Sequence, residues 1–354
     1  MTELKVRRAG MLTSVQDLGR WGFQSSGVPV AGAMDLPALR LGNAMLGNPE
    51  GAAALEVTLL GPELEVCGCG AAVFAGGDLG FSVNGRPVGS WRVVELKDGD
   101  VISFTGPKSG CRGNLCFAGG VDVPLVMNSR STYMRAKIGG FEGRALKNGD
   151  IVKIGEPSPL WKQLDGFTLP PELNPALPPD APLSLMTGLQ EDMFTEEGKS
   201  TLFSSEYTIT SDSDRMGCRL EGDKIAHSGK SGDIVSDAIP LGAVQVPSHG
   251  MPIVMLADRQ TTGGYTKIGV LTPLSIEALV QKMPGTAVRF IKASPDDGTA
   301  EQMKIADAVR RVNELRCTYV SRPRAAQVSG GLASTRLRLT IDGREYDVTC
   351  EEIK

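Results

Sequence analysis

The hydrophobic residues of this chain fall mostly in short runs rich in Val, Ile, Phe and Thr, such as 93–96 and 101–104. Runs of this length and composition, bounded by turn residues, are typical of β-strands. Four dipeptides that favour hairpin turns separate them: Asn84-Gly85, Asp98-Gly99, Asn148-Gly149 and Asp342-Gly343. The segment 96–102 returns as 146–152 with almost the same residues, which predicts that one hairpin is reused. The pattern therefore predicts a mainly β fold, and closure into barrels would remove the exposed strand edges.

Two segments have the period of a helix instead. The first is 36–46, where Asp35 precedes the first turn as an N-cap and a glycine follows the last turn. The second is 299–315, where Thr299 and Gln302 have the spacing of a capping box and three apolar residues share one face. We expect few other helices.

A proline-rich stretch divides the chain, whose 354 residues suggest two domains. The predicted parts are an N-terminal β-barrel domain (1–165), a stiff linker (166–183), a C-terminal β-barrel domain (184–295), and a tail of a helix and a β-hairpin (296–354). The residues between this helix and the hairpin, 321–334, are small and polar, so we expect them to be flexible. The hairpin itself is predicted by alternating apolar residues over 337–349.

Charge and composition exclude several classes of function. A net charge of −4 and a pI of about 5.5 provide no basic field for nucleic acid or an anionic membrane. No apolar run is long enough to cross a bilayer, and the first residues lack the apolar core of a signal peptide, so we expect a cytoplasmic protein. Seven cysteines and two histidines predict neither a disulfide framework nor a metal site, and they supply few residues for a His-dependent triad.

The most informative segment is 251–265, in which an apolar run ends in a dense polar cluster. The cluster consists of Asp258, Arg259, Gln260, Thr261, Thr262, Gly263, Gly264 and Tyr265. A buried strand would hold these residues rigidly at its end, and Arg259 offers a planar fork suited to a carboxylate or phosphate. The two glycines can adopt positive φ and align their amides as an anion-binding nest. A polar hairpin loop with a glycine turn remains an equal alternative.

Two nucleotide-binding motifs fail on spacing. Gly229-Lys230-Ser231 resembles the end of a P-loop, but Lys224 stands where the motif needs glycine. Gly68-Cys69-Gly70 has Val73 where the dinucleotide motif needs its third glycine. If ATP is used, neither motif binds it.

A series of short blocks in the same order resembles the allophanate hydrolase subunit 2-like family. The blocks are 14–20, 27–35, 118–124, 129–132, 139–144, 213–217 and 258–265, spread over roughly residues 3 to 293. This family includes carboxyltransferase domains of biotin-dependent urea carboxylases and the C subunit of bacterial ATP-dependent 5-oxoprolinase. The resemblance implies cyclophilin-like barrels and a site shared with a partner, which would be the B subunit of the oxoprolinase or an allophanate hydrolase subunit 1-like protein.

The resemblance favours a 5-oxoprolinase C subunit, which would act with the A and B subunits and use ATP through the complex to open a cyclic amide. Arg215 and Arg259 would then bind a carboxylate or phosphate, Asp258 or Asp214 would accept the lactam N–H, and the amides of the two glycines would stabilise an oxyanion. Met216 and Tyr265 would wall the pocket. The further substrate-binding candidates are Gln16, Asp17, Arg20, Pro29 and Asp35.

Simpler roles remain open for several of these residues. Asp35 is favoured as a helix cap over a site residue. Gln16, Asp17 and Arg20 are as well explained by a structural turn network as by a pocket wall. A salt-bridged strand end is the simpler alternative for Asp214 and Arg215, but surface pairs of that kind contribute little stability, so a functional role is favoured for them.

Two other functions remain as alternatives. A biotin-dependent carboxyltransferase would use the same groups to hold carboxybiotin and a planar amide such as urea. The hairpin at 337–349 resembles the opening strands of a biotinyl carrier domain, but no Ala-Met-Lys-Met acceptor follows, so biotin would not be attached to this chain; a β-tail packed on a barrel or a partner is the favoured interpretation. The family also resembles a regulatory antagonist of a kinase inhibitor, which would need only a protein-binding surface.

Overall fold

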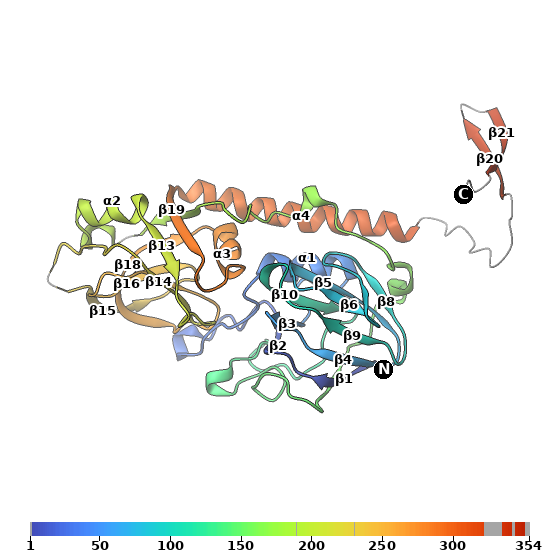
Figure 1. Ribbon diagram of the computed structural model, residues 1–354, viewed down its shortest axis with the longest axis horizontal. Helices are drawn as coiled ribbons and strands as arrows, with labels where there is room; N and C mark the ends of the chain where they lie inside the picture. Colours follow the sequence, from blue (N-terminus) through green and yellow to red (C-terminus); the bar gives the residue numbers. More distant parts are fainter. Residues whose placement is uncertain (1, 189, 230, 322–334, 342–343, 351–354) are drawn as a thin grey trace. The chain divides into compact units, whose positions relative to one another are not determined.

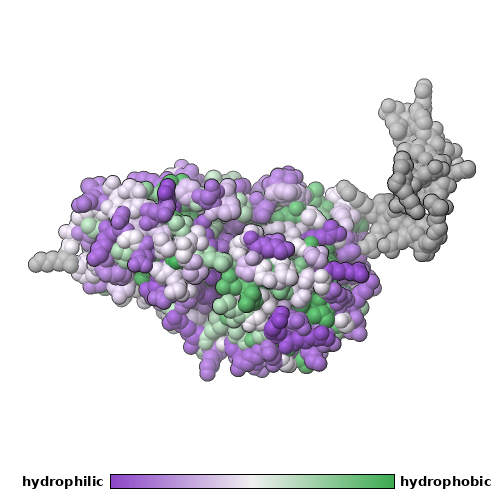
Figure 2. Space-filling view, viewed as in Figure 1, coloured by the Kyte–Doolittle hydropathy of each residue, from purple (hydrophilic) through white to green (hydrophobic). Residues whose placement is uncertain are grey.

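The computed structural model describes residues 2–188, 190–229, 231–321, 335–341 and 344–350. Residues 1–320 form one compact unit and residues 321–354 form a second (Figure 1). The first unit contains three β-sheets, which confirms the mainly β prediction. On the face seen in Figure 2, polar and apolar residues are mixed over this unit.

Two sheets enclose the core of the N-terminal half. The first contains, in spatial order, β11 (Ile151–Lys153), β1 (Glu3–Arg8), β4 (Glu63–Cys67), β9 (Val101–Phe104), β6 (Phe81–Val83) and β7 (Arg86–Pro87). The second contains β2 (Leu12–Gln16), β3 (Ala54–Thr58), β10 (Ser109–Phe117), β5 (Gly70–Asp78) and β8 (Val94–Leu96). Apolar side chains from both sheets form one buried cluster, in which the rings of Phe74 and Phe104 meet edge to face at 5.0 Å.

The C-terminal half is a closed barrel of seven strands. Its members, in order, are β12 (Leu183–Thr187), β19 (Ala287–Ala293), β13 (Glu206–Ile209), β14 (Gly217–Glu221), β17 (Ile253–Met255), β16 (Ala243–Val246) and β18 (Thr262–Leu271). The barrel closes because β18 also pairs with β12, from Leu185 opposite Leu271 to Thr187 opposite Gly269. An additional strand, β15 (Asp233–Ala238), pairs with β18 at its other end. Closure removes the edges that short strands would otherwise expose.

The repeated Lys-Asp/Asn-Gly-Asp segment is a reused turn, but the prediction of a reused hairpin is wrong. In both copies the aspartate carboxylate accepts the lysine amide at 2.7 Å and the glycine amide donates to a valine carbonyl at 2.8 Å. The first copy leads from β8 in one sheet to β9 in the other, so the flanking strands do not pair. The hairpin predicted at Asn84-Gly85 is present between β6 and β7, and both residues have positive φ.

The first predicted helix is confirmed in its bounds and its caps. In α1 (Leu36–Leu46), Asp35 Oδ1 accepts the Ala38 amide at 3.0 Å, and Gly47 ends the helix with a φ of 73°. The second helix, α4 (Pro295–Ser321), is longer at both ends than predicted. Its capping pair is Ser294 and Asp297 rather than Thr299 and Gln302. Proline is favoured in the first turn of a helix, which explains the earlier start.

Helix α4 joins the two halves of the first unit. Its buried residues Ala308, Val309 and Val312 pack in the cluster that surrounds α1, and its Glu301 accepts the Leu274 amide at the start of α3 (Pro273–Val280). One more α-helix, α2 (Glu196–Ser204), covers the barrel near β19. The short 3-10 helices are η1 (Gln24–Ser26), η2 (Met134–Ala136), η3 (Pro159–Gln163), η4 (Pro171–Leu173) and η5 (Glu191–Met193). In the described residues, no helix has both the length and the apolar character needed to cross a membrane.

The proline-rich segment contributes two leucines to the core of the first unit. Leu169 and Leu173 are buried in the same cluster as α1 and α4, so the segment forms part of the core as well as connecting the sheets. The second unit contains the predicted hairpin, in which β20 (Thr335–Ile341) pairs antiparallel with β21 (Arg344–Cys350). The predicted turn Asp342-Gly343 and the stretch 322–334 lie outside the described residues.

Candidate functional site

The polar segment after β17 lies between two pockets of the first unit. One pocket, of about 310 Å³, is lined by polar side chains that include Asp214, Gln245, Gln260 and Tyr265. The other, of about 300 Å³, is lined by Arg259, Gln260 and Thr261 together with residues from 21–30 and 238–241. Gln260 lines both pockets, so this segment lies at the boundary between them.

Arg215 and Asp258 meet below this segment in a buried ion cluster. Arg215 donates to both oxygens of Asp258, at 3.1 Å from Nε and 3.0 Å from Nη2. It also donates to Glu56 on β3 and, at 2.6 Å, to the Gly32 carbonyl. All three side chains of the cluster are at least nine-tenths buried. The cluster therefore ties the barrel to the N-terminal half.

Two of the predicted catalytic residues, Arg215 and Asp258, have their hydrogen-bond partners inside this cluster. Both Asp258 oxygens accept from Arg215, so a lactam N–H could be accepted only by the remaining lone pairs of a carboxylate in a buried ion pair. Each nitrogen of the Arg215 guanidinium likewise has a partner inside the protein. We therefore describe Arg215, Asp258 and Glu56 as positioning residues beneath the pockets.

Arg259 differs from Arg215, because its guanidinium has no acidic partner among the described residues. Its guanidinium donates to the carbonyls of Ile239 at 2.9 Å and Leu256 at 3.2 Å. Burial lowers the pKa of Arg259 to about 10, which leaves it protonated near neutral pH. A buried cation held only by carbonyl oxygens is a favourable place for an anion, since the anion supplies the missing charge. The predicted role of Arg259 as a carboxylate or phosphate ligand is compatible with this position.

The larger polar pocket contains a buried amide donor that the sequence analysis missed. Gln245 lies on β16, is 2% exposed, and its Nε2 has no hydrogen-bond partner in the described residues. It lines the pocket together with Gln260, Met216 and Tyr265. A buried N–H group without a partner is costly, and a ligand oxygen would satisfy it. The sequence signal was a single polar residue within the apolar run 243–246.

Asp214 lies at the rim of the same pocket and also shapes its wall. Its Oδ1 accepts the Met216 amide at 2.7 Å, which fixes the turn before β14, and its Oδ2 pairs with Arg135 at 3.2 Å. Both members of this pair are more than half exposed, so the pair remains accessible to a ligand or a partner protein.

The predicted glycine nest is wrong. Gly263 and Gly264 lie within β18 and neither has a positive φ. The reason for a glycine at 263 is space: an added Cβ would lie 2.6 Å from Ile239 Cδ1 and 2.9 Å from Gln245 Nε2. Gly263 therefore allows the amide of Gln245 to approach the strand.

The N-terminal candidates form a structural network, as the alternative interpretation held. Asp17 accepts hydrogen bonds from the amides of Gly19 and Arg130 and from two serine hydroxyls. Arg20 is fully buried and donates to the carbonyls of Val126 and Ser131. Gln16 is also fully buried, beside Thr132.

Pro29 and Asp35, the other N-terminal candidates, also lie outside the pockets around Gln260. Pro29 is buried and lines neither of them. Asp35 caps α1 and lines a different cavity. Among the described residues, no group of three or more His, Cys, Asp or Glu side chains is arranged to hold a metal ion.

The fold defines a mainly β protein whose closed barrel has polar side chains beside two pockets at its strand ends. A family model described as "Carboxyltransferase domain, subdomain A and B" matches residues 26–292. The chain belongs to this carboxyltransferase-domain family.

Comparison with known proteins gives relatives of two kinds. The chain is 37% identical to the 5-oxoprolinase C subunit of Escherichia coli over 83% of its own length and 92% of the relative. It is 33% identical to the corresponding C subunit of Haemophilus influenzae, covering 87% and 94% of the two chains. The solved structure of the K. lactis urea amidolyase is 28% identical with a TM-score of 0.82; the match covers 88% of this chain but only 20% of that one.

Proposed function

We propose that this chain is the C subunit of an ATP-dependent 5-oxoprolinase, which converts 5-oxoproline to glutamate together with the A and B subunits. The observation that carries the proposal is that relatives named as C subunits of 5-oxoprolinase match over more than nine-tenths of their own length. The urea amidolyase relatives contain the matching region as a small part of a much longer chain. Because the match to the 5-oxoprolinase C subunits covers nearly their whole length and has the higher identity, it favours them over the urea amidolyases as a guide to function.

The two pockets suit the two polar ends of 5-oxoproline. In this proposal Arg259 binds the substrate carboxylate, because its guanidinium lacks an acidic partner in the described residues. The amide N–H groups of Gln245 and Gln260 donate to the lactam carbonyl oxygen, where negative charge develops during ring opening. The Arg215 cluster holds the strand end beneath both groups.

ATP would be bound by the partner subunits. Neither glycine-rich segment of this chain has the spacing of a phosphate-binding loop. Transfer of the γ-phosphoryl group of ATP to the lactam oxygen would turn that oxygen into a better leaving group. Water would then add to the ring carbon, phosphate would leave and the C–N bond would break, while the residues of this chain position the ring. The exposed Asp214–Arg135 pair and Tyr265 would then face the B subunit across a shared site.

Reconstitution tests the proposal. The chain is purified with its partner subunits and assayed with 5-oxoproline and with urea, each with ATP and with or without biotin. We expect ATP-dependent formation of glutamate and no turnover of urea. Turnover of urea that requires biotin would instead support the carboxyltransferase alternative, which the similarity in fold to urea amidolyase favours. No turnover of either substrate would favour the regulatory alternative.

Replacing Gln260 with alanine is expected to lower kcat/KM for 5-oxoproline in the reconstituted complex by about a hundredfold, on the scale of losing one oxyanion donor. Gln163→Ala provides the matched control, because Gln163 is exposed and lines neither pocket. Steady-state kinetics and a thermal melt are measured for both variants. An unchanged kcat/KM in Gln260→Ala would remove this residue from the proposed site.

A further inference from the structure

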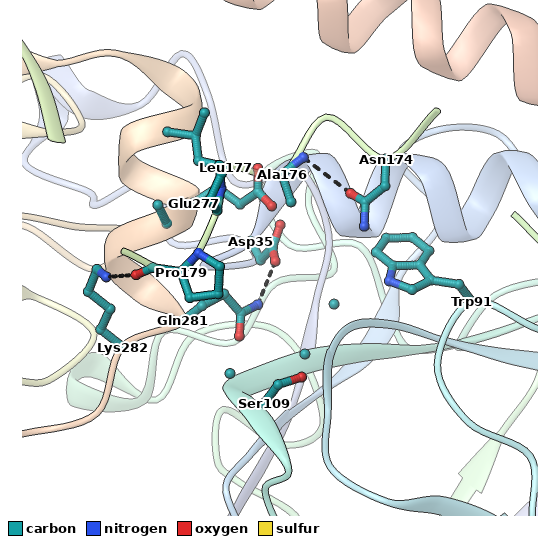
Figure 3. Close-up of a pocket in the computed structure, with 15 residues that line it drawn as sticks. Asp35, Trp91, Ser109, Asn174, Ala176, Leu177, Pro179, Glu277, Gln281 and Lys282 are labelled. Carbon is teal, nitrogen blue, oxygen red and sulfur yellow. Dashed lines mark hydrogen bonds between the residues drawn. The ribbon is translucent and has the colours of Figure 1, made fainter. Parts of the chain in front are cut away.

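A separate cavity of about 200 Å³ lies where the start of α1 meets α3 and the residues 174–179 (Figure 3). None of the residues that line it lines the two pockets around Gln260. Its polar lining consists of Asp35, Ser109, Asn174, Glu277, Gln281 and Lys282. Its lining is therefore distinct from that of the site proposed above.

Glu277 is the unexplained group of this cavity. It lies on α3 and is 7% exposed, and its Oε2 has no hydrogen-bond partner in the described residues. Figure 3 shows its carboxyl group directed toward that of Asp35 across the cavity. An acid buried without a hydrogen bond destabilises a fold. Its presence therefore requires an explanation other than stability.

Asp35 faces Glu277 from the N-terminus of α1 and is held rigidly. Its Oδ2 accepts from Gln281 Nε2 at 2.7 Å, and Gln281 Oε1 accepts the amides of Cys111 and Arg112, each at 3.2 Å. Glycine is required around this bridge, since a Cβ at Gly110 would lie 2.5 Å from Gln281 Oε1. The cavity therefore contains one carboxyl group held by hydrogen bonds, that of Asp35, and one without a partner at Oε2, that of Glu277.

Among the described residues, none of the charged neighbours of this acidic pair forms an ion pair with Asp35 or Glu277. Lys282 donates its Nζ to the Pro179 carbonyl at the exposed rim. On α4, Lys304 attracts Glu277, but Glu301 on the same helix repels it. Opposite the acids, the indole ring of Trp91 forms a wall of the cavity (Figure 3).

We propose that this cavity binds a small organic ammonium ion, with its N–H groups on Asp35 and Glu277 and its carbon chain against Trp91. Two carboxylates and an aromatic face recognise an alkylammonium group through charge, hydrogen bonds and cation–π attraction. A metal ion is a poorer fit, because no set of three metal-binding side chains occurs in the described residues. The Asp35 carboxylate disfavours an anion in the same place.

Proton release provides a specific signature of this binding. Burial raises the pKa of Glu277, with the nearby Asp35 adding to the effect, so Glu277 holds a proton near neutral pH. Burial likewise raises the pKa of Asp35. An arriving ammonium ion favours the ionised carboxylate and displaces that proton to the buffer.

The test is isothermal titration calorimetry of the full chain with n-propylammonium chloride, in two buffers with different ionisation enthalpies. We expect one binding site and the release of nearly one proton at pH 7. Glu277→Gln is expected to weaken binding by at least about tenfold and to abolish proton release, while the exposed control Glu206→Gln leaves both unchanged. Neutral n-propanol is expected not to bind.

Each contrary outcome overturns the proposal. Equal affinity for n-propanol would mean that the cavity recognises only the carbon chain. Equal affinity in Glu277→Gln would place the ammonium group elsewhere. The wild-type chain supplies a second test that needs no variant: binding is expected to weaken as the pH falls from about 8 to about 6, since more work is needed to ionise Glu277. Affinity independent of pH would contradict the role of this proton.

Discussion

Replacing Arg215 with methionine is expected to lower the free energy of unfolding by about 3–5 kcal/mol. The substitution keeps an apolar side chain of similar length but leaves Glu56 and Asp258 buried without their shared cation. An uncompensated buried charge costs far more than the net gain from the original pair. Urea denaturation, followed by circular dichroism, measures the difference.

The matched control is Arg289→Met, which removes an arginine whose side chain is 69% exposed and pairs with Glu206 at 3.0 Å. Surface pairs of this kind are worth about 0–1 kcal/mol, so this variant is expected to remain close to the wild type. If both variants lost the same small amount of stability, Arg215 would not be the link between the two halves. Combining Arg215→Met with Glu56→Gln and Asp258→Asn is expected to recover part of the loss, because no buried charge then remains.

This cluster changes how activity data on Asp258 should be read. A loss of activity in Asp258→Ala would follow from loss of the fold as readily as from loss of a proton acceptor, since Arg215 would be left without one of its partners. Kinetic constants for such a variant must be divided by its folded fraction. Gln260 and Arg259 are better probes of the proposed site, because neither belongs to the cluster.

The parts of the fold that depend on neighbours in the sequence were predictable. The cap at Asp35, the glycine stop of α1 and the turn at Asn84-Gly85 all follow from local backbone preferences. The repeat of this turn was also recognisable from the sequence. The sequence did not show that its first copy leads from one sheet to the other. That choice depends on where the next strand finds its partner, which local preference does not determine.

The site was predictable only in part, because its key contacts join distant segments. The polar segment 258–265 could be recognised at the end of an apolar strand, and it does lie beside two pockets. Glu56 is 159 residues from Arg215, and nothing in its own strand indicates that pairing. Gly263 was expected to adopt positive φ in an anion-binding nest or in a glycine turn, whereas its small size is needed within a strand.

The free energy of unfolding is also expected to depend strongly on pH, because of Glu277, the buried acid that lines the separate cavity. The ordinary pKa of a glutamate side chain is 4.5, and burial together with the nearby Asp35 raises the pKa of Glu277 to about 9 in the folded protein. Between these two values the folded chain holds a proton that the unfolded chain has released, so stability must fall as the pH rises. The loss from about pH 5 to about pH 8 is on the order of a few kcal/mol.

Glu277→Gln is expected to remove most of this slope, because a glutamine keeps the shape of the protonated acid and cannot ionise. Denaturant titrations of both proteins at intervals across that pH range measure the difference, with Glu206→Gln as the exposed control. In the Glu277→Gln variant, Asp35 is expected to leave a smaller dependence of stability on pH, of the same sign. Burial also raises the pKa of Asp35, but its hydrogen bonds from Ala38 and Gln281 oppose that shift. Parallel pH profiles for the wild type and Glu277→Gln would mean that Glu277 is ionised in the folded protein, and that a cation already compensates its charge.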